Sequence, residues 1–111
     1  MASDPINLSI CISSCKARDL LVQCLETVLK DPPNTTYEII IVNDGSTDST
    51  NKIIQSFNDP RIKLIENTQN IGLTKSLNIG VKICRGDYIA RIDADDISFK
   101  QRLRKQYHFI L

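Results

Sequence analysis

The chain has 111 residues, 41% hydrophobic and 24% charged, a composition that excludes disordered and collagen-like proteins and fits a single domain over residues 1–111. Its formal net charge of +1 argues against a nucleic-acid partner, because a nearly neutral chain creates no long-range field that attracts a polyanion. The first eight residues lack the basic start and apolar stretch of a signal peptide, and no aliphatic run is long enough to cross a bilayer. We therefore expect a cytoplasmic protein, with peripheral association at the cytoplasmic membrane face only in a full-length form.

The first half of the chain predicts a strand, a helix and a second strand. An apolar run at Ile6–Ile12 is followed by an amphipathic helix at Ala17–Lys30, and two prolines end that helix. The apolar residues of the helix recur at helical intervals: Leu21, Cys24, Leu25, Val28 and Leu29. The next run, Tyr37–Val42, is apolar throughout its centre, which is typical of a strand covered on both faces and indicates a parallel sheet.

The second half continues the alternation. The segment Asp44–Asp48 predicts a turn into a helix that has Ser46 or Thr47 as its N-cap and ends near Phe57. The remaining elements are a strand at Ile62–Glu66, a helix at Thr74–Cys84, a strand at Tyr88–Ile92 and a last helix from near Phe99. This order predicts an α/β fold with a Rossmann-like, doubly wound, mostly parallel sheet, whose ligands bind at the carboxyl ends of the strands.

The four cysteines predict small buried side chains, reduced in a cytosol. They are Cys11, Cys15, Cys24 and Cys84. They have no CxxC spacing and the chain has one histidine, so a zinc site is not expected. A disulfide between two of them stays open as an alternative.

Two polar clusters follow predicted strands, at Asn43–Ser46 and Asp93–Asp96. Three carboxylates within four residues repel one another, and a bound cation or hydrogen-bond donors would offset that repulsion. Oxygen ligands on a tight loop suit Mg²⁺ or Mn²⁺, which commonly bridge carboxylates to a diphosphate. The alternative is an acidic loop that only caps the following helix.

Asp44 and Lys75 each allow two interpretations. A carboxylate in an Asp-Gly-Ser turn can accept a hydrogen bond from a nucleotide base or ribose, but it can also belong to an ordinary turn. Lys75 follows the polar segment Asn70–Gly72 and can either reach a phosphate or be a solvated lysine. The local sequence leaves both pairs of alternatives open.

Several segments together resemble family 2 glycosyltransferases. The run Glu38–Asp48 resembles the Asp-Asp-Gly-Ser-Thr-Asp segment of the family, and Asn70–Gly72 with Asn78–Gly80 resembles its repeated Asn-x-Gly pattern. Gly86–Ile89, followed by Asp93–Asp96, is similar to its Gly-(Glu/Asp)-Tyr-Ile and Asp-x-Asp segments. Each motif is weak alone, whereas their joint order and spacing cover almost the whole chain.

The resemblance implies the nucleotide-sugar-binding half of a GT-A domain. By it, Asp44 hydrogen-bonds the nucleotide base, while Asp93 and Asp95 hold the ribose and the metal on the diphosphate. We add Ser13 and Lys75 to the expected nucleotide-binding residues. Asp93, Asp95 and Asp96 hold Mn²⁺ or Mg²⁺ as a Lewis acid on the diphosphate. The implied activity is inverting, metal-dependent transfer from a nucleotide-sugar donor, a UDP-sugar above all, to a glycan or lipid-linked acceptor in polysaccharide or lipopolysaccharide synthesis.

The chain also departs from the family pattern. Ser13–Lys16 replaces a Pro-x-Tyr-Asn segment, Asn43 replaces the first aspartate of the pair, and Lys100 replaces a proline. The family's catalytic base is expected outside this chain, and His108 is expected to be a surface or packing residue. We therefore expect a fragment that binds a donor and does not turn it over efficiently.

Two other classes compete with a transferase. The first is a non-catalytic nucleotide-binding module of the same fold. The second is a phosphotransfer domain, whose acidic groups lie around the first strand, where this chain has Ser13, Ser14 and Cys15.

Overall fold

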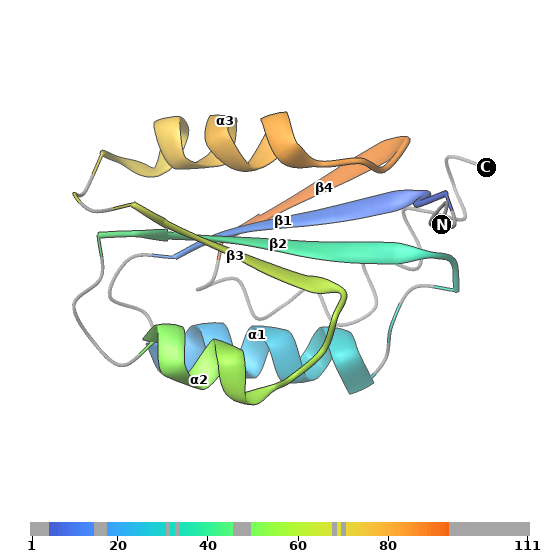
Figure 1. Cartoon of the computed structure of the whole chain (residues 1–111), viewed down its shortest axis with the longest axis horizontal. Coiled ribbons are helices and arrows are strands. Elements are labelled where there is room, and N and C mark those ends of the chain that lie inside the picture. Colours follow the sequence, from blue (N-terminus) through green and yellow to red (C-terminus); the bar gives the residue numbers. More distant parts are fainter. Residues whose placement is uncertain are drawn as a thin grey trace.

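The computed structural model describes residues 5–14, 18–30, 32, 34–45, 50–67, 69 and 71–93. Within them the chain alternates strands and helices (Figure 1). The elements are β1 (Leu8–Ser14), α1 (Arg18–Lys30), β2 (Tyr37–Asp44), α2 (Thr50–Ser56), β3 (Ile62–Asn67), α3 (Leu73–Ile83) and β4 (Tyr88–Asp93). The last predicted helix and the predicted N-caps at positions 46 and 47 lie outside the described residues.

The described strands form one parallel sheet in the order β3-β2-β1-β4. Helices α1 and α2 cover one face of this sheet and α3 covers the other (Figure 1). From β1 the chain moves outward through β2 to β3, and α3 then carries it across the sheet to β4 on the far side of β1. The α/β, Rossmann-like, doubly wound fold predicted from the sequence is confirmed.

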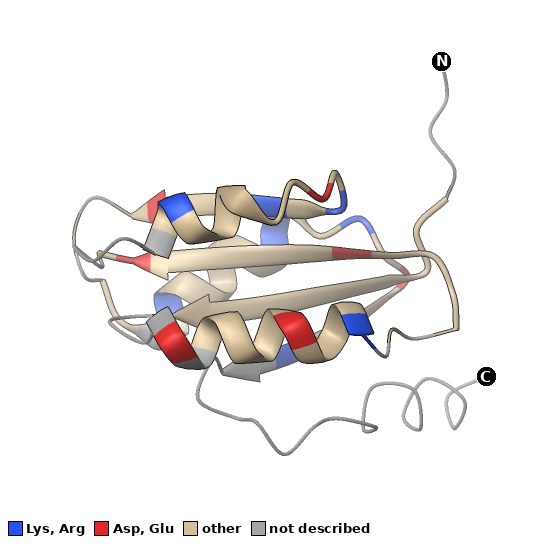
Figure 2. Ribbon diagram, turned by 90° about the horizontal axis from the view of Figure 1, so that it is seen from below, with Lys and Arg blue, Asp and Glu red and all other residues tan. Residues whose placement is uncertain are grey.

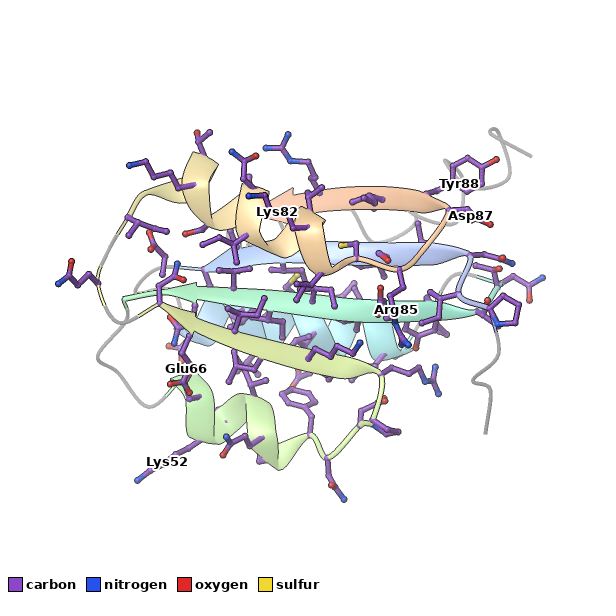
Figure 3. The ribbon with its side chains drawn as sticks, turned by 45° about the horizontal axis from the view of Figure 1, so that its top comes forward. Lys52, Glu66, Lys82, Arg85, Asp87 and Tyr88 are labelled. Atoms are coloured by element: carbon purple, nitrogen blue, oxygen red, sulfur yellow. The ribbon has the colours of Figure 1, made fainter. Side chains whose placement is uncertain are left out.

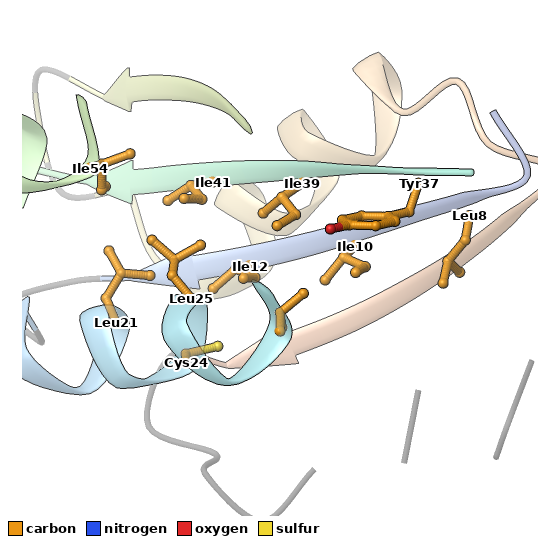
Figure 4. Packing of buried hydrophobic residues seen from close by; sticks show 11 residues of the cluster. Leu8, Ile10, Ile12, Leu21, Cys24, Leu25, Tyr37, Ile39, Ile41 and Ile54 are labelled. Atoms are coloured by element: carbon orange, nitrogen blue, oxygen red, sulfur yellow. The ribbon is translucent and has the colours of Figure 1, made fainter. Parts of the chain in front are cut away.

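The main core lies between the sheet and α1 (Figure 4). Every residue of β1 and β2 is buried, as a strand covered on both faces requires. Alternate residues of the two strands, among them Ile10, Ile12, Ile39 and Ile41, pack with one side of α1. The predicted inward residues of α1 are buried or partly buried: Leu21, Cys24, Leu25, Val28 and Leu29.

The four described strands extend further toward their carboxyl ends than the sequence predicts, β3 by the single residue Asn67. β1 spans Leu8–Ser14 rather than Ile6–Ile12, because its last residues pair with β2, where Ser13 lies opposite Val42 and Ser14 opposite Asn43. β2 likewise continues to Asp44, and β4 to Asp93. Polar residues of this kind are typical of turns, but ladder hydrogen bonds from neighbouring strands hold them in extended conformation here.

The cysteines only partly match the prediction of burial. Cys11 and Cys24 are buried, Cys84 is half-buried, and none of these three is in a disulfide. Burial, with the neighbouring Cys84 thiol as a smaller cause, raises the pKa of the Cys11 thiol to about 11. Cys11 is therefore a thiol at neutral pH and packs as a small apolar side chain. Cys15 lies outside the described residues.

The described surface carries charge on many elements. Lys and Arg residues are spread over helices, strands and turns and do not gather on one face (Figure 2). Across the residues that the structure describes, no helix is long and apolar enough to cross a membrane.

Helix α3 packs closely on β1 and β2 at Gly80. A Cβ atom at this position would overlap Cys11 Sγ and would lie 3.0 Å from Val42 Cγ2. Both contacts come from the side of the sheet opposite α1, and both belong to buried residues. The distance between α3 and the sheet therefore depends on the missing side chain of Gly80.

We expect Gly80→Ala to destabilise the protein by about 1–3 kcal/mol through this overlap, although alanine favours a helix more than glycine does. Chemical denaturation of Gly80→Ala, Cys11→Ala and the double variant measures the effect. Because Cys11→Ala removes the overlapping sulfur, Gly80→Ala should cost less in that background. Equal costs in the two backgrounds would show that the overlap is not the cause.

Candidate functional site

The carboxyl ends of the strands bring predicted site residues together at one edge of the sheet. Ser13 on β1 lies opposite Asp93 on β4, although the two are far apart in the sequence. On the other side of β1, Ser14 lies opposite Asn43, which precedes Asp44 at the end of β2. β1 has β2 on one side and β4 on the other, so this edge is the point where a doubly wound sheet opens a ligand crevice.

Asp44 is buried and hydrogen-bonded to the segment that leads into α3. Its Oδ1 atom accepts from the Ile71 N–H at 2.8 Å and from Asn67 Nδ2 at 3.1 Å. Its Oδ2 atom accepts from the Gly72 N–H at 2.9 Å. Gly72 adopts φ 94°, a conformation that disfavours other residues and turns the chain toward the carboxylate.

These donors account for most of the hydrogen-bonding capacity of Asp44. Burial alone would raise the pKa of Asp44, but the hydrogen bonds from Ile71, Asn67, Gly72 and Ser76 lower it below its ordinary value. A carboxylate accepts about four hydrogen bonds, and the three donors within 3.1 Å occupy most of that capacity. The predicted contact between Asp44 and a nucleotide base stays a prediction.

Two buried polar atoms at this end of the sheet, on the face opposite the Asp44 side chain, have no hydrogen-bond partner within the described structure. They are Ser14 Oγ and Asn43 Oδ1, on neighbouring strands and in register. The amide nitrogen of Asn43 is used, since it donates to Asn51 Oδ1 at 2.7 Å. A buried polar atom without a partner is costly, so its presence at a strand end favours a site completed by water or ligand.

The residues of the predicted metal site lie mostly outside the described part of the chain. Asp95 and Asp96 lie there, and of Asp93 the structure describes the backbone alone. Among the described residues no three His, Cys, Asp or Glu side chains lie together as a metal site. The two described oxygen atoms without a partner at this end of the sheet, Ser14 Oγ and Asn43 Oδ1, are of the kind that a hard cation such as Mg²⁺ or Mn²⁺ accepts as ligands.

The phosphate contact of Lys75 and the place of the catalytic base both stay predictions. Lys75 lies in the first turn of α3 and is exposed, at the same end of the sheet as Asp44. Its phosphate contact stays a prediction. His108 lies outside the described residues, and the expectation that the base lies outside this chain is not tested.

Sequence reasoning missed Asn67 and Ser76. Asn67 ends β3 opposite Asp44 and donates to both Asp44 Oδ1 and Ser76 Oγ, each at 3.1 Å. Ser76 is fully buried on α3. Their positions in the sequence could have identified them as site residues, since Asn67 follows an apolar strand and Ser76 lies on the inward side of a helix.

A second buried carboxylate, Glu38, lies at the opposite end of β2. Its Oε2 accepts from the Ser9 hydroxyl and from the Arg85 N–H, both at 2.6 Å. Burial would raise the pKa of Glu38, but the hydrogen bonds from Ser9 and Arg85, with the charge of Lys63, lower it below its ordinary value. Ser9 Oγ also accepts from the Gly86 N–H at 2.8 Å, which joins the turn before β4 to β1.

The parallel doubly wound sheet, with polar groups gathered at the carboxyl ends of β1, β2 and β4, defines the class of nucleotide-binding α/β domains. The particular family follows from the sequence. Residues 9–111 match the family described as Glycosyl transferase family 2, and the chain belongs to that family.

Relatives and solved structures agree with the family. The chain is 36% identical over 106 residues to WfaP of Escherichia coli, named UDP-Glc:alpha-D-GlcNAc-diphosphoundecaprenol beta-1,3-glucosyltransferase, covering 93% of this chain and 41% of WfaP. It superposes on residues 1–349 of S. aureus TarS in complex with UDP-GlcNAc with a TM-score of 0.84 at 25% identity, covering 95% of this chain and 31% of that TarS chain. The mannosyltransferase PcManGT from Pyrobaculum calidifontis, solved with GDP-Man and Mn²⁺, shares the fold, with a TM-score of 0.83 at 18% identity and 97% and 33% coverage. The chain therefore spans less than half the length of each of these proteins.

We expect Asp44→Asn to destabilise the protein by about 1–3 kcal/mol at pH 7, because an amide nitrogen would face an N–H donor. The pKa of Asp44 is lower in the folded state than the ordinary aspartate value of about 3.9. The charged carboxylate therefore stabilises the fold above that ordinary value. This stabilisation is lost as the pH falls through the folded-state pKa. Urea denaturation between pH 7 and pH 3 should show the difference between the two proteins shrinking toward low pH.

Asp87→Asn is the matched control, because Asp87 is an exposed carboxylate in the turn before β4 (Figure 3). It should leave stability within about 0.5 kcal/mol. A pH-independent difference for Asp44→Asn would contradict the role of its charge.

Proposed function

We propose that this chain forms the donor-binding half of an inverting, metal-dependent glycosyltransferase that acts in polysaccharide or lipopolysaccharide synthesis. The observation that carries the proposal is the alignment of Ser13, Asp44 and Asp93 at the carboxyl edge of the sheet in a family 2 chain. The names of WfaP and of the TarS complex support a UDP-sugar donor and a lipid-linked or glycan acceptor. We place the protein in the cytoplasm or at the cytoplasmic membrane face.

In this proposal the nucleoside binds against the segment that joins β3 to α3. Asp44 holds Ile71 and Gly72 in place through their N–H groups, so the backbone at these two residues is fixed before the ligand arrives. Ser14 Oγ and Asn43 Oδ1 lie at the same end of the sheet, on its other face, and have no partner among the described residues. A ligand hydroxyl, amine or bound water that reaches them would remove the cost of two unpaired polar atoms.

The anionic end of the donor faces the end of β4. Asp93 closes that strand, and Asp95 and Asp96 follow within three residues. Carboxylates so close together would repel a diphosphate, and a divalent cation bound by Asp93, Asp95 and Asp96 would reverse this repulsion. When bound, such a cation offsets the charge that builds on the departing nucleoside diphosphate. The inversion of the anomeric centre rests on the family resemblance alone.

Calorimetric titration of the chain with UDP, GDP and CDP, each with Mn²⁺ and again with EDTA, tests the proposal. We expect one nucleotide, UDP above all, to bind with Mn²⁺ and to lose most of its affinity in EDTA. Binding of none of the three would reject the donor-site assignment for this chain. Equal binding in Mn²⁺ and EDTA would favour a non-catalytic nucleotide-binding module instead.

We also expect Asp95→Ala to remove the metal-dependent part of nucleotide binding while the unfolding transition stays that of the parent chain. Asp44→Ala should weaken binding both with and without metal, because it loosens the segment around Ile71 and Gly72. The same titration, with a denaturation curve for each variant, measures both effects. Full donor affinity in Asp95→Ala would contradict the metal assignment.

A further inference from the structure

A cavity of about 410 Å³ opens at the amino ends of the strands, away from the candidate site. Its walls come from the residues before β1, the first residues of β2, the start of β3 and the residue that follows the α3 C-cap. β2 has eight residues, so roughly 25 Å separate its two ends. The cavity is therefore distinct from the edge that carries Ser13, Asp44 and Asp93.

Three cationic side chains line this cavity. The side chains of Arg61, Lys63 and Arg85 are 52%, 43% and 51% exposed, so each keeps N–H groups in contact with solvent. Arg61 immediately precedes β3, Lys63 belongs to β3, and Arg85 lies in the loop between α3 and β4. Figure 3 shows Arg85 at the end of the sheet where β2 begins, well away from Lys52.

One buried carboxylate faces these cations, and hydrogen bonds already stabilise its charge. Glu38 Oε1 lies 3.6 Å from Lys63 Nζ and 3.4 Å from Arg85 Nε, so two cations share one oxygen atom. The other oxygen accepts from Ser9 and from the Arg85 N–H. Arg61 forms a separate ion pair with Asp59, in which Arg61 Nε lies 3.7 Å from Asp59 Oδ1. Positive charge therefore exceeds negative charge at this cavity, because three cationic side chains meet only the carboxylates of Glu38 and Asp59.

The rest of the lining is suited to an apolar group. Pro5, Ile6 and Pro60 line the cavity, and the Arg61 guanidinium lies over the Tyr37 ring with 4.8 Å from Cζ to the ring centroid. This cation–π contact holds the guanidinium at the cavity wall. The cavity is several times larger than an inorganic phosphate, so it has room for an organic group attached to an anion.

We propose that this cavity binds a phosphate ester, with the phosphoryl oxygens on Arg61, Lys63 and Arg85 and the organic part against the prolines. A phosphate dianion with several acceptor oxygens matches two guanidinium groups and an ammonium better than a monovalent carboxylate does. The ester is either a soluble metabolite or the headgroup of an anionic lipid. This proposal does not depend on donor binding at the other end of the sheet.

Titration of the ¹⁵N-labelled chain with inorganic phosphate in EDTA, followed by NMR, tests the site directly. The backbone amides of Thr35, Thr36, Arg85 and Gly86 should shift in a saturable way, because they belong to or adjoin the cavity wall. The amides of Gly45 and Ile71, at the carboxyl edge, should not shift. Shifts confined to the carboxyl edge, or none at all, would overturn the proposal.

Charge-removing variants connect the shifts to the cations. The double variant Lys63→Gln and Arg85→Gln should weaken phosphate binding about tenfold or more, since each charged hydrogen bond is strong. Arg61→Gln leaves the partners of Glu38 intact, so it tests the site even if the double variant folds poorly. Lys82→Gln on α3 removes an exposed lysine outside the cavity and should leave binding unchanged. Equal binding by Arg61→Gln and the parent, with a folded double variant that also binds normally, would overturn the proposal.

Vesicles separate the two sources of the phosphate ester. Co-sedimentation with phosphatidylglycerol vesicles, absent with phosphatidylcholine and lost in the Arg61→Gln variant, would identify a lipid headgroup. Saturable phosphate shifts without vesicle binding would identify a soluble ester. Vesicle binding that persists in the variants, together with absent phosphate shifts, would refute the site.

Discussion

The attachment of α3 to β2 is the constraint on which the rest of the structure depends. Glu38 and Asp44 lie at the two ends of β2 and are separated by an even number of residues. Both side chains therefore lie on the same face of the strand as Ile40 and Val42. That face meets α3, where Gly80 approaches Val42 and Ile40. Asp44 accepts the N–H groups of Ile71 and Gly72 before the helix, and Glu38 accepts the Arg85 N–H after it. One strand therefore fixes both ends of one helix.

This arrangement also places the candidate site. Because α3 is held at both ends, the chain that leaves it enters β4 beside β1, and the register brings Asp93 opposite Ser13. The same attachment orders the turn at Gly72 beside the ends of β2 and β3. Burying two charged carboxylates is costly, and each is offset by several donors rather than by a single counter-ion. Several donors in fixed directions specify one geometry for the helix.

The sequence predicted the elements and the fold class well, because they depend on local patterns. The helical spacing in α1 and the apolar centre of β2 identified buried positions that the structure confirms. The pattern could not identify the partners of Glu38 and Asp44. Those donors belong to Ser9, Arg85, Asn67 and the turn at Gly72, which lie 23 or more residues away along the chain. The ends of β1 were misjudged for the same reason, since pairing with a distant strand decided them.

The outer edge of β4 has a consequence for handling the protein. Within the described residues β4 pairs only with β1, and it carries Tyr88 and Ile89 at 36% and 41% exposure. An open strand edge with apolar neighbours offers unpaired N–H and C=O groups to any second strand. Edge-to-edge association of two copies would extend the sheet without disturbing α3 or the strand ends. Concentration and solvent, rather than intrinsic stability, would then set how long the purified chain stays monomeric.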